Sequence, residues 1–161
     1  YKVCRDMMRK VVPRHLYLGS RMHKGSPEIM EEAARFTDVV SLNRYMPLAI
    51  TKLPETFDRP CLIGEIHFGA PDRGVPGTGL SHVGDQLARS RAYAAYVLDA
   101  VLQPNIVGTH WFAYTDQSAA GRWSAGRNGE NYQVGFVDVT DTLYPEISAT
   151  SRGLAEIMYS L

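Results

Sequence analysis

Helix-like stretches alternate four times with short, β-rich apolar runs along this chain. The apolar runs, which we expect to be strands, are residues 15–20, 39–45, 61–67 and 106–114. Strands that alternate with helices at this spacing form βαβ units, so the strands of the sheet run parallel. The runs are apolar on both faces, as strands covered by helices must be. The sequence therefore predicts an α/β fold built on a parallel sheet.

The stretches between these runs have the periodicity of helices. Helices are expected at residues 2–12, 26–36, 50–57, 81–103 and 145–161, with a short additional strand at 134–139. The second helix begins with Ser26, Pro27 and Glu28, residue types that favour a helix start. Its expected buried face carries Ile29, Ala33 and Phe36. The longest helix keeps near-helical spacing at Val83, Leu87, Ala94, Leu98, Val101 and Leu102.

Length and charge limit the choice of fold and partner. The 161 residues suit one domain, but a complete eight-stranded β/α barrel needs about 250 residues. The 17 basic and 17 acidic side chains cancel, which argues against a nucleic-acid partner. The longest uncharged apolar run near a helix, 92–98, is far shorter than a membrane span. Cys4 and Cys61 are too few for a disulfide framework, and both are expected to be free and buried.

Polar side chains appear where the predicted strands end, which is where parallel α/β folds carry their sites. Period-two alternation places Ser41, Asn43 and Tyr45 on one side of one strand, and Glu65 and His67 on one side of the next. Burying a carboxylate there is costly unless it is paired or functional. Glu65 is therefore the leading catalytic candidate, and a structural salt bridge is the alternative.

Trp111 lies near the end of the last predicted strand, where an indole can either stack on a sugar ring or pack in the core. A half-buried structural role is the corresponding alternative for Tyr45 and for His67. The glycines and prolines of residues 69–80 indicate a shaped loop over a site. The sequence has no convincing metal-ligand spacing, nucleophile elbow or phosphate-binding loop, so we expect neither metal nor cofactor.

Three stretches carry a resemblance to a known family: GEIHFGAPDRG at 64–74, NIVGTHWFAYTDQ at 105–117 and GENYQVGFVDVTDTLYPE at 129–146. They resemble the C-terminal half of a clan A glycoside hydrolase, most closely the family 50 β-agarases. That resemblance implies a TIM-type (β/α)8 barrel of which the four predicted strands are strands five to eight. Residues 1–161 are then a single partial catalytic domain whose N-terminal half is missing, from a protein that is secreted or periplasmic.

The resemblance also implies roles for individual residues. Glu65 becomes the nucleophile of a retaining hydrolase, and Tyr45 donates a hydrogen bond to it. Trp111 forms the floor of the subsite that binds the cleaved sugar. The groove for a β-galactosidic polysaccharide such as agarose is lined by Asn43, His67, Asn131 and Tyr132.

A retaining hydrolase needs a second carboxyl group about 5–5.5 Å from its nucleophile. By the resemblance, this acid/base glutamate ends strand four, before Tyr1, so the isolated chain is predicted to be inactive. A non-catalytic carbohydrate-binding half barrel and a β-galactosidase-like exoenzyme are the alternatives. A half barrel also exposes sheet edges, so the expected partner is the N-terminal half of the barrel or a second copy of the chain.

Overall fold

The computed structural model describes residues 1–23, 26–49, 59–122 and 129–160. Three strands, β1 (Val40–Asn43), β2 (Cys61–Ile66) and β3 (Ile106–Trp111), form one sheet in the order β1-β2-β3. Four helices accompany them: α1 (Lys2–Val11), α2 (Pro27–Phe36), α3 (Gln86–Val101) and α4 (Pro145–Ile157). Both strand pairs are parallel, which confirms the predicted α/β fold with a parallel sheet.

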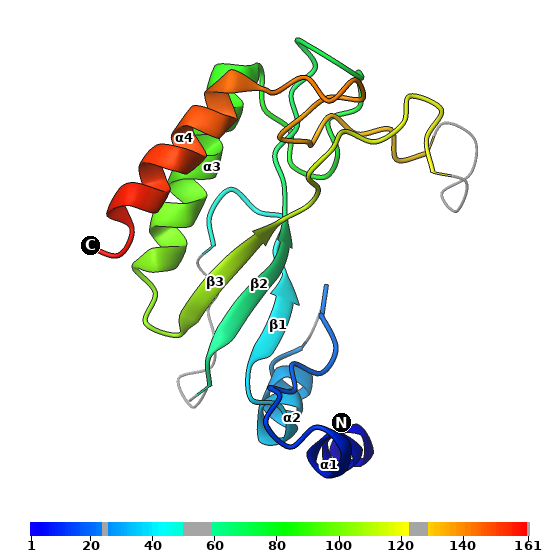
Figure 1. The fold of residues 1–161 in the computed structure, drawn as a ribbon, viewed down its shortest axis with the longest axis vertical. Coiled ribbons are helices and arrows are strands. Elements are labelled where there is room, and N and C mark those ends of the chain that lie inside the picture. Colours follow the sequence, from blue (N-terminus) through cyan, green and yellow to red (C-terminus); the bar gives the residue numbers. More distant parts are fainter. Residues whose placement is uncertain (24–25, 50–58, 123–128, 161) are drawn as a thin grey trace.

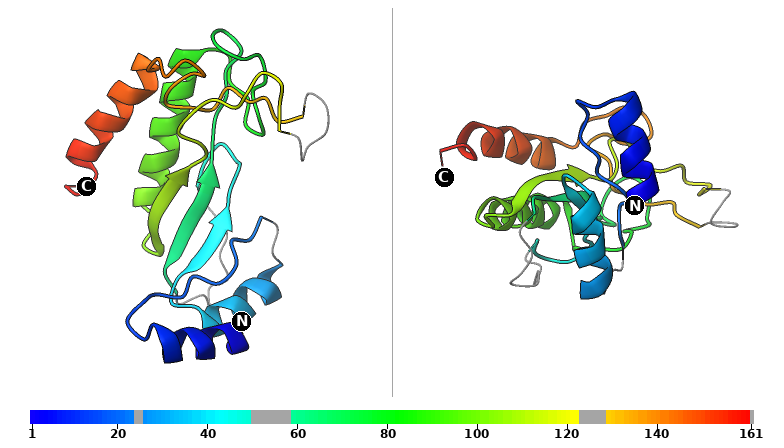
Figure 2. Two further views of the ribbon diagram at one scale, coloured as in Figure 1. Left: turned by 45° about the vertical axis from the view of Figure 1, so that its right-hand side comes forward. Right: turned by 90° about the horizontal axis from the view of Figure 1, so that it is seen from below.

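The helices are arranged unevenly around the sheet (Figures 1 and 2). Helices α3 and α4 lie side by side along one side of the sheet, and α1 and α2 lie near the end where β1 begins. The segments that follow β2 and β3 gather beyond the carboxyl ends of the strands. In a parallel α/β fold this is the end at which ligands bind.

Two apolar clusters hold the sheet. Ile63 and Ile66 of β2 pack with Phe68 against Tyr96 and Ala100 of α3. The second cluster contains Val40, Leu42 and Cys61, with Met22, Met30 and Ala34 packed against it. β2 contributes to both clusters: Cys61 at its start packs on the side of α2, and Ile63 and Ile66, towards its carboxyl end, pack against α3.

A register shift in the β1–β2 pairing places Asn43 directly opposite Glu65. The register runs Leu42↔Ile63 and then shifts, so that Asn43 pairs with Glu65. Without the shift, Asn43 would lie opposite Gly64, which has no side chain to contact. Bulges of this kind change the direction in which a side chain points and are common next to active sites.

The strand predicted at residues 15–20 is wrong: in the structure this segment forms no ladder. The parallel bridge to β1 lies two residues beyond this segment, at Met22↔Leu42, and within the segment the Tyr17 carbonyl accepts the Asp38 amide at 2.9 Å. Gly19 adopts a φ of +66°, which an extended strand does not accommodate. The amide of Tyr17 donates to the Asp38 side chain at 2.7 Å rather than to a neighbouring strand. The expected strand at 134–139 is likewise reduced to isolated bridges at Val137.

The helix boundaries and buried faces also differ from those expected. Helix α3 begins five residues later than predicted, where Asp85 accepts the amide of Ala88 at 2.7 Å and caps it. Leu87 and Leu102 are exposed, and the buried positions include the polar Gln86, Arg89 and Ser90. Apolar periodicity missed this face because polar residues fill its first turn.

Smaller differences concern the exposure of individual side chains. On the predicted face of α2, Ala33 is buried and Phe36 is partly buried as expected, but Ile29 is exposed. Both cysteines are free, but Cys4 is exposed while Cys61 is buried. The helix expected at 50–57 lies outside the described residues, as does Leu161. Among the residues described, no helix is long and apolar enough to cross a membrane.

Candidate functional site

Glu65 lies at the carboxyl end of β2 and receives hydrogen bonds from two neighbouring side chains. Its Oε2 accepts from Asn43 Nδ2 at 2.6 Å and from the Tyr45 hydroxyl at 2.7 Å. Its Oε1 forms an ion pair with Arg21. The carboxylate is 14% exposed, so it is largely enclosed yet reachable. Three donors from two segments therefore fix the orientation of this carboxylate.

Tyr45 is suited to remain a donor. Burial, and then the adjacent Glu65 carboxylate, raise the pKa of the Tyr45 phenol well above its ordinary value. The hydroxyl consequently keeps its proton at neutral pH and donates a hydrogen bond to Glu65. The contact expected between these two side chains is thus present in the structure.

Arg21 reaches Glu65 across a glycine. A Cβ built on Gly64 would meet the Arg21 side chain, with Arg21 Cγ at 2.8 Å, and Ser41 Oγ at 2.8 Å. The aliphatic part of Arg21 therefore crosses β2 where that strand has no side chain. Sequence reasoning did not identify Arg21, although it directly follows the first predicted strand and the rule of polar strand ends applied to it.

His67, two residues beyond Glu65, is covered on all sides and only 1% exposed. Its Nε2 accepts the amide of Leu80 at 2.7 Å. Three rings surround it, with centroids at 4.8 Å for Tyr45, 6.0 Å for Phe112 and 5.9 Å for Tyr132. Burial lowers the pKa of His67 to about 4, so the imidazole is neutral at neutral pH.

Acid is therefore expected to destabilise the fold through His67. Its ordinary pKa is 6.5 and its folded pKa is about 4, so the unfolded chain binds the extra proton between these values. The stabilisation is complete above pH 6.5 and is lost as the pH falls towards 4. Urea unfolding should give a free energy about 2 kcal/mol lower at pH 5 than at pH 7. The His67→Gln variant should lose much less over the same interval, and an equal loss in both proteins would contradict this.

Trp111 belongs to a separate aromatic cluster against α3. Its Nε1 donates to the Val134 carbonyl at 2.6 Å, and its ring packs edge-on against Tyr93 (5.4 Å) and Phe136 (5.8 Å). The next residue, Phe112, is the one whose ring contacts His67. β3 ends at Trp111, so the two neighbouring rings lie on either side of the point where the strand ends. The predicted stacking of Trp111 on a sugar stays a prediction.

The remaining predicted groove residues lie in the segment that follows β3. Tyr132 forms a bridge with Gly77, its amide donates to Gln117 Oε1 at 3.0 Å, and its ring contacts His67. Asn131 packs on Gly77, where an added Cβ would meet Asn131 Oδ1 at 2.7 Å. Asn43, Tyr45 and Glu65 are thus in direct contact, and His67 and Tyr132 adjoin them. No group of three or more His, Cys, Asp or Glu side chains in the described ranges is placed to hold a metal ion.

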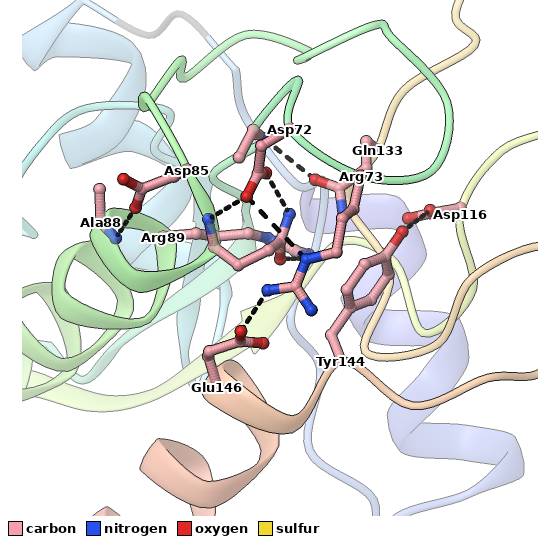
Figure 3. Close-up of polar contacts among 11 residues, drawn as sticks. Asp72, Arg73, Asp85, Ala88, Arg89, Asp116, Gln133, Tyr144 and Glu146 are labelled. Atoms are coloured by element: carbon pink, nitrogen blue, oxygen red, sulfur yellow. Dashed lines mark hydrogen bonds and ion pairs between the residues drawn. The ribbon is translucent and has the colours of Figure 1, made fainter.

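A buried polar network fixes the segments that carry these residues (Figure 3). Arg89 of α3 is fully buried and donates to the Phe68 carbonyl at 2.8 Å and to the Gly135 carbonyl at 2.7 Å. Its guanidinium also lies over the rings of Trp111 and Tyr144, at 5.6 and 5.2 Å from their centroids. Burial lowers the pKa of Arg89 to about 10, which leaves it charged at neutral pH.

Carboxylates complete this network around Arg89. Asp116 accepts from the Tyr144 hydroxyl at 2.7 Å and from the Gly135 amide at 2.6 Å. Arg73 forms an ion pair with Glu146 at the start of α4. The segments after β2 and β3 and the first turns of α3 and α4 are therefore joined beyond the strand ends. Apolar periodicity gave no sign of this network.

Comparison with known proteins finds that the chain is similar to part of several β-agarases. No protein-family model matches it. It is 37% identical over 169 residues to β-agarase B of Vibrio sp. (strain JT0107), a match that covers 100% of this chain and 17% of that protein. A solved exo-β-agarase matches with a TM-score of 0.90 and 37% identity over 99% of this chain and 22% of that chain. The structure of PfGH50B gives a TM-score of 0.91 and 35% identity over 98% and 24%.

These relatives are glycoside hydrolases, and the parts of the solved structures that the chain covers have the fold found here. More particularly, the chain resembles part of a family 50 β-agarase, as its sequence motifs suggested. It spans 15–17% of the length of the curated relatives that it matches.

Proposed function

We propose that this chain is the C-terminal part of a retaining glycoside hydrolase that cleaves β-galactosidic bonds in a polysaccharide such as agarose. Glu65 is its nucleophile. The observation that carries the proposal is the Glu65 carboxylate at a strand end, held by Asn43, Tyr45 and Arg21. The similarity to β-agarases supports the substrate class.

The proposed reaction has two steps. A Glu65 oxygen attacks the anomeric carbon while the glycosidic C–O bond breaks and a general acid protonates the departing oxygen. Water, deprotonated by the same second group, then attacks the anomeric carbon and releases Glu65. During the attack the Tyr45 and Asn43 donors stay on Oε2, so Oε1, the oxygen that pairs with Arg21, is the one that attacks the sugar.

We assign the acid/base to a glutamate outside this sequence, at the end of strand four of a barrel. Glu130 forms an ion pair with Arg122 and accepts a hydrogen bond from Gln117 Nε2 at 3.5 Å, so its carboxylate is engaged away from Glu65. The isolated chain is therefore expected to bind but not to hydrolyse.

The same proposal makes β1, β2 and β3 strands six, seven and eight of a TIM-type barrel, with the extended segment before Met22 in the place of strand five. The outer edge of β3 pairs with no strand among the described residues. Val107 on β3 is 61% exposed, and His110 is exposed as well. A sheet edge that is unpaired and carries an exposed apolar side chain tends to associate with another chain unless it is covered. The N-terminal half of the barrel supplies this cover, or a second copy when the chain is isolated.

The stereochemistry of the product tests this function. Proton NMR during hydrolysis of an agarose oligosaccharide, by the protein with its natural, uncut termini, is expected to show the β-anomer forming first. The isolated 161-residue chain is expected to give no product. First appearance of the α-anomer would exclude Glu65 as the nucleophile of a retaining mechanism. Hydrolysis by the isolated chain would refute an acid supplied from outside it.

A further inference from the structure

His67 connects the loop that follows β2 to the side chains around Glu65. Its Nε2 accepts the Leu80 amide at 2.7 Å, thirteen residues further along the chain. Because that nitrogen accepts a hydrogen bond, a neutral imidazole must carry its proton on Nδ1. The backbone amide of Leu80 would otherwise be a donor without a partner at the edge of the site.

The loop over residues 69–80 lies directly on this imidazole. Gly79 has a φ of +70°, and a Cβ there would meet His67 Cε1 at 2.9 Å and Cδ2 at 3.1 Å. The beginning and end of the loop also meet, since a Cβ on Gly69 would lie 2.6 Å from the Thr78 carbonyl carbon. The glycines therefore allow the backbone to approach where a side chain would hold the loop away.

The same ring supports the group that hydrogen-bonds Glu65. The Tyr45 ring lies 4.8 Å from the His67 ring, and the Tyr45 hydroxyl donates to Glu65 at 2.7 Å. Tyr132, from the segment after β3, packs on His67 at 5.9 Å. One imidazole thus contacts the post-β2 loop, the residue that follows β1 and the segment that follows β3.

We propose that His67 is a positioning residue. Its neutral imidazole holds loop 69–80 in place and fixes the Tyr45 ring so that its hydroxyl donates to the Glu65 carboxylate. The effect on catalysis rests on the proposed function, whereas the hydrogen bond to Leu80 does not. At 1% exposure the ring acts through Tyr45 and the loop rather than by touching substrate.

Amide hydrogen exchange tests the connection without any assay of activity. In the protein with its natural termini, His67→Phe keeps a ring but removes the acceptor, and His67→Gln keeps an acceptor near the position of Nε2. We expect exchange at Leu80 to become about tenfold faster in His67→Phe and to stay within about twofold of wild type in His67→Gln. His15→Phe, at an exposed histidine distant in sequence, is the matched control and should change nothing at Leu80.

Two results would overturn the proposal: equal exchange at Leu80 in wild type and His67→Phe, or equally fast exchange in the Phe and Gln variants. If His67→Phe does not fold, nitrogen NMR of the wild-type imidazole decides. A proton on Nδ1 and a bare Nε2 is the expected tautomer, and a proton on Nε2 contradicts the contact with Leu80.

Kinetics with agarose oligosaccharides then separates positioning from a merely structural role. His67→Phe is expected to lower kcat about tenfold or more with little change in KM, and His67→Gln to restore most of it. A rise in KM at unchanged kcat would contradict the proposed route through Tyr45 and Glu65. If wild type shows no turnover, the proposed function fails, and the exchange result still stands on its own.

Discussion

Replacing Glu65 by glutamine is expected to lower kcat for agarose oligosaccharides by about 10³-fold or more. The substitution keeps the size and shape of the side chain but removes the nucleophilic oxygen. It also replaces one acceptor oxygen by an NH2 group, which cannot accept a hydrogen bond. Asn43, Tyr45 and Arg21 all donate towards this position, so one of these contacts is lost. The measurement is steady-state hydrolysis by the protein with natural termini.

The matched control is Glu156→Gln, at an exposed glutamate of α4. It should leave kcat within about twofold of wild type, as surface substitutions usually do. Thermal unfolding of both variants ensures that the Glu65 effect is not loss of fold. A well-folded Glu65→Gln protein that retained ordinary turnover would refute the assignment of the nucleophile.

Replacing Arg89 by methionine is expected to lower the free energy of unfolding by about 3–5 kcal/mol. The methionine keeps much of the buried volume but leaves the carbonyls of Phe68 and Gly135 and the Gln86 side chain without their donor. It also removes the cation that lies over Trp111 and Tyr144. Urea unfolding of the same protein measures the change.

Arg91→Met is the control for this prediction, because Arg91 lies on the same helix and is exposed. Its cost should stay within about 0.5 kcal/mol. Arg89→Lys should fall between the two, since an ammonium keeps the charge but cannot reach three acceptors in the geometry of a guanidinium. Equal stabilities of the Arg89 and Arg91 variants would show that the network is not what joins the loops.

The parallel sheet and its polar end followed from local sequence. β2 and β3 were recognisable as short apolar runs, and period-two alternation put Asn43 and Tyr45 on one side of their strand and Glu65 on one side of the next. The structure brings these side chains into contact, and the Tyr45–Glu65 hydrogen bond is the one that the family resemblance implied. The bulge that sets Asn43 against Glu65 has no signature in the sequence, yet it strengthens that contact.

The parts that sequence reasoning missed depend on contacts between distant segments. Arg89 looks like a surface residue on a helical wheel and is buried only because two carbonyls and two rings enclose it. Arg21 follows a segment that has the composition of a strand but forms no ladder. Trp111, the last residue of β3, packs against Tyr93 of α3, whereas the next residue, Phe112, contacts His67, and composition does not encode that division.

The central claim is that Glu65 forms a covalent bond to a galactosyl unit, and trapping that bond tests it most directly. A 2-deoxy-2-fluoro-β-galactosyl fluoride, extended with the agarose repeat where needed, slows both steps but keeps a fast leaving group, so the intermediate accumulates. After protease digestion, mass spectrometry is expected to find the fluorosugar on the peptide that contains Glu65, attached to that side chain. Attachment to another residue, or inactivation without any label at Glu65, would contradict the account.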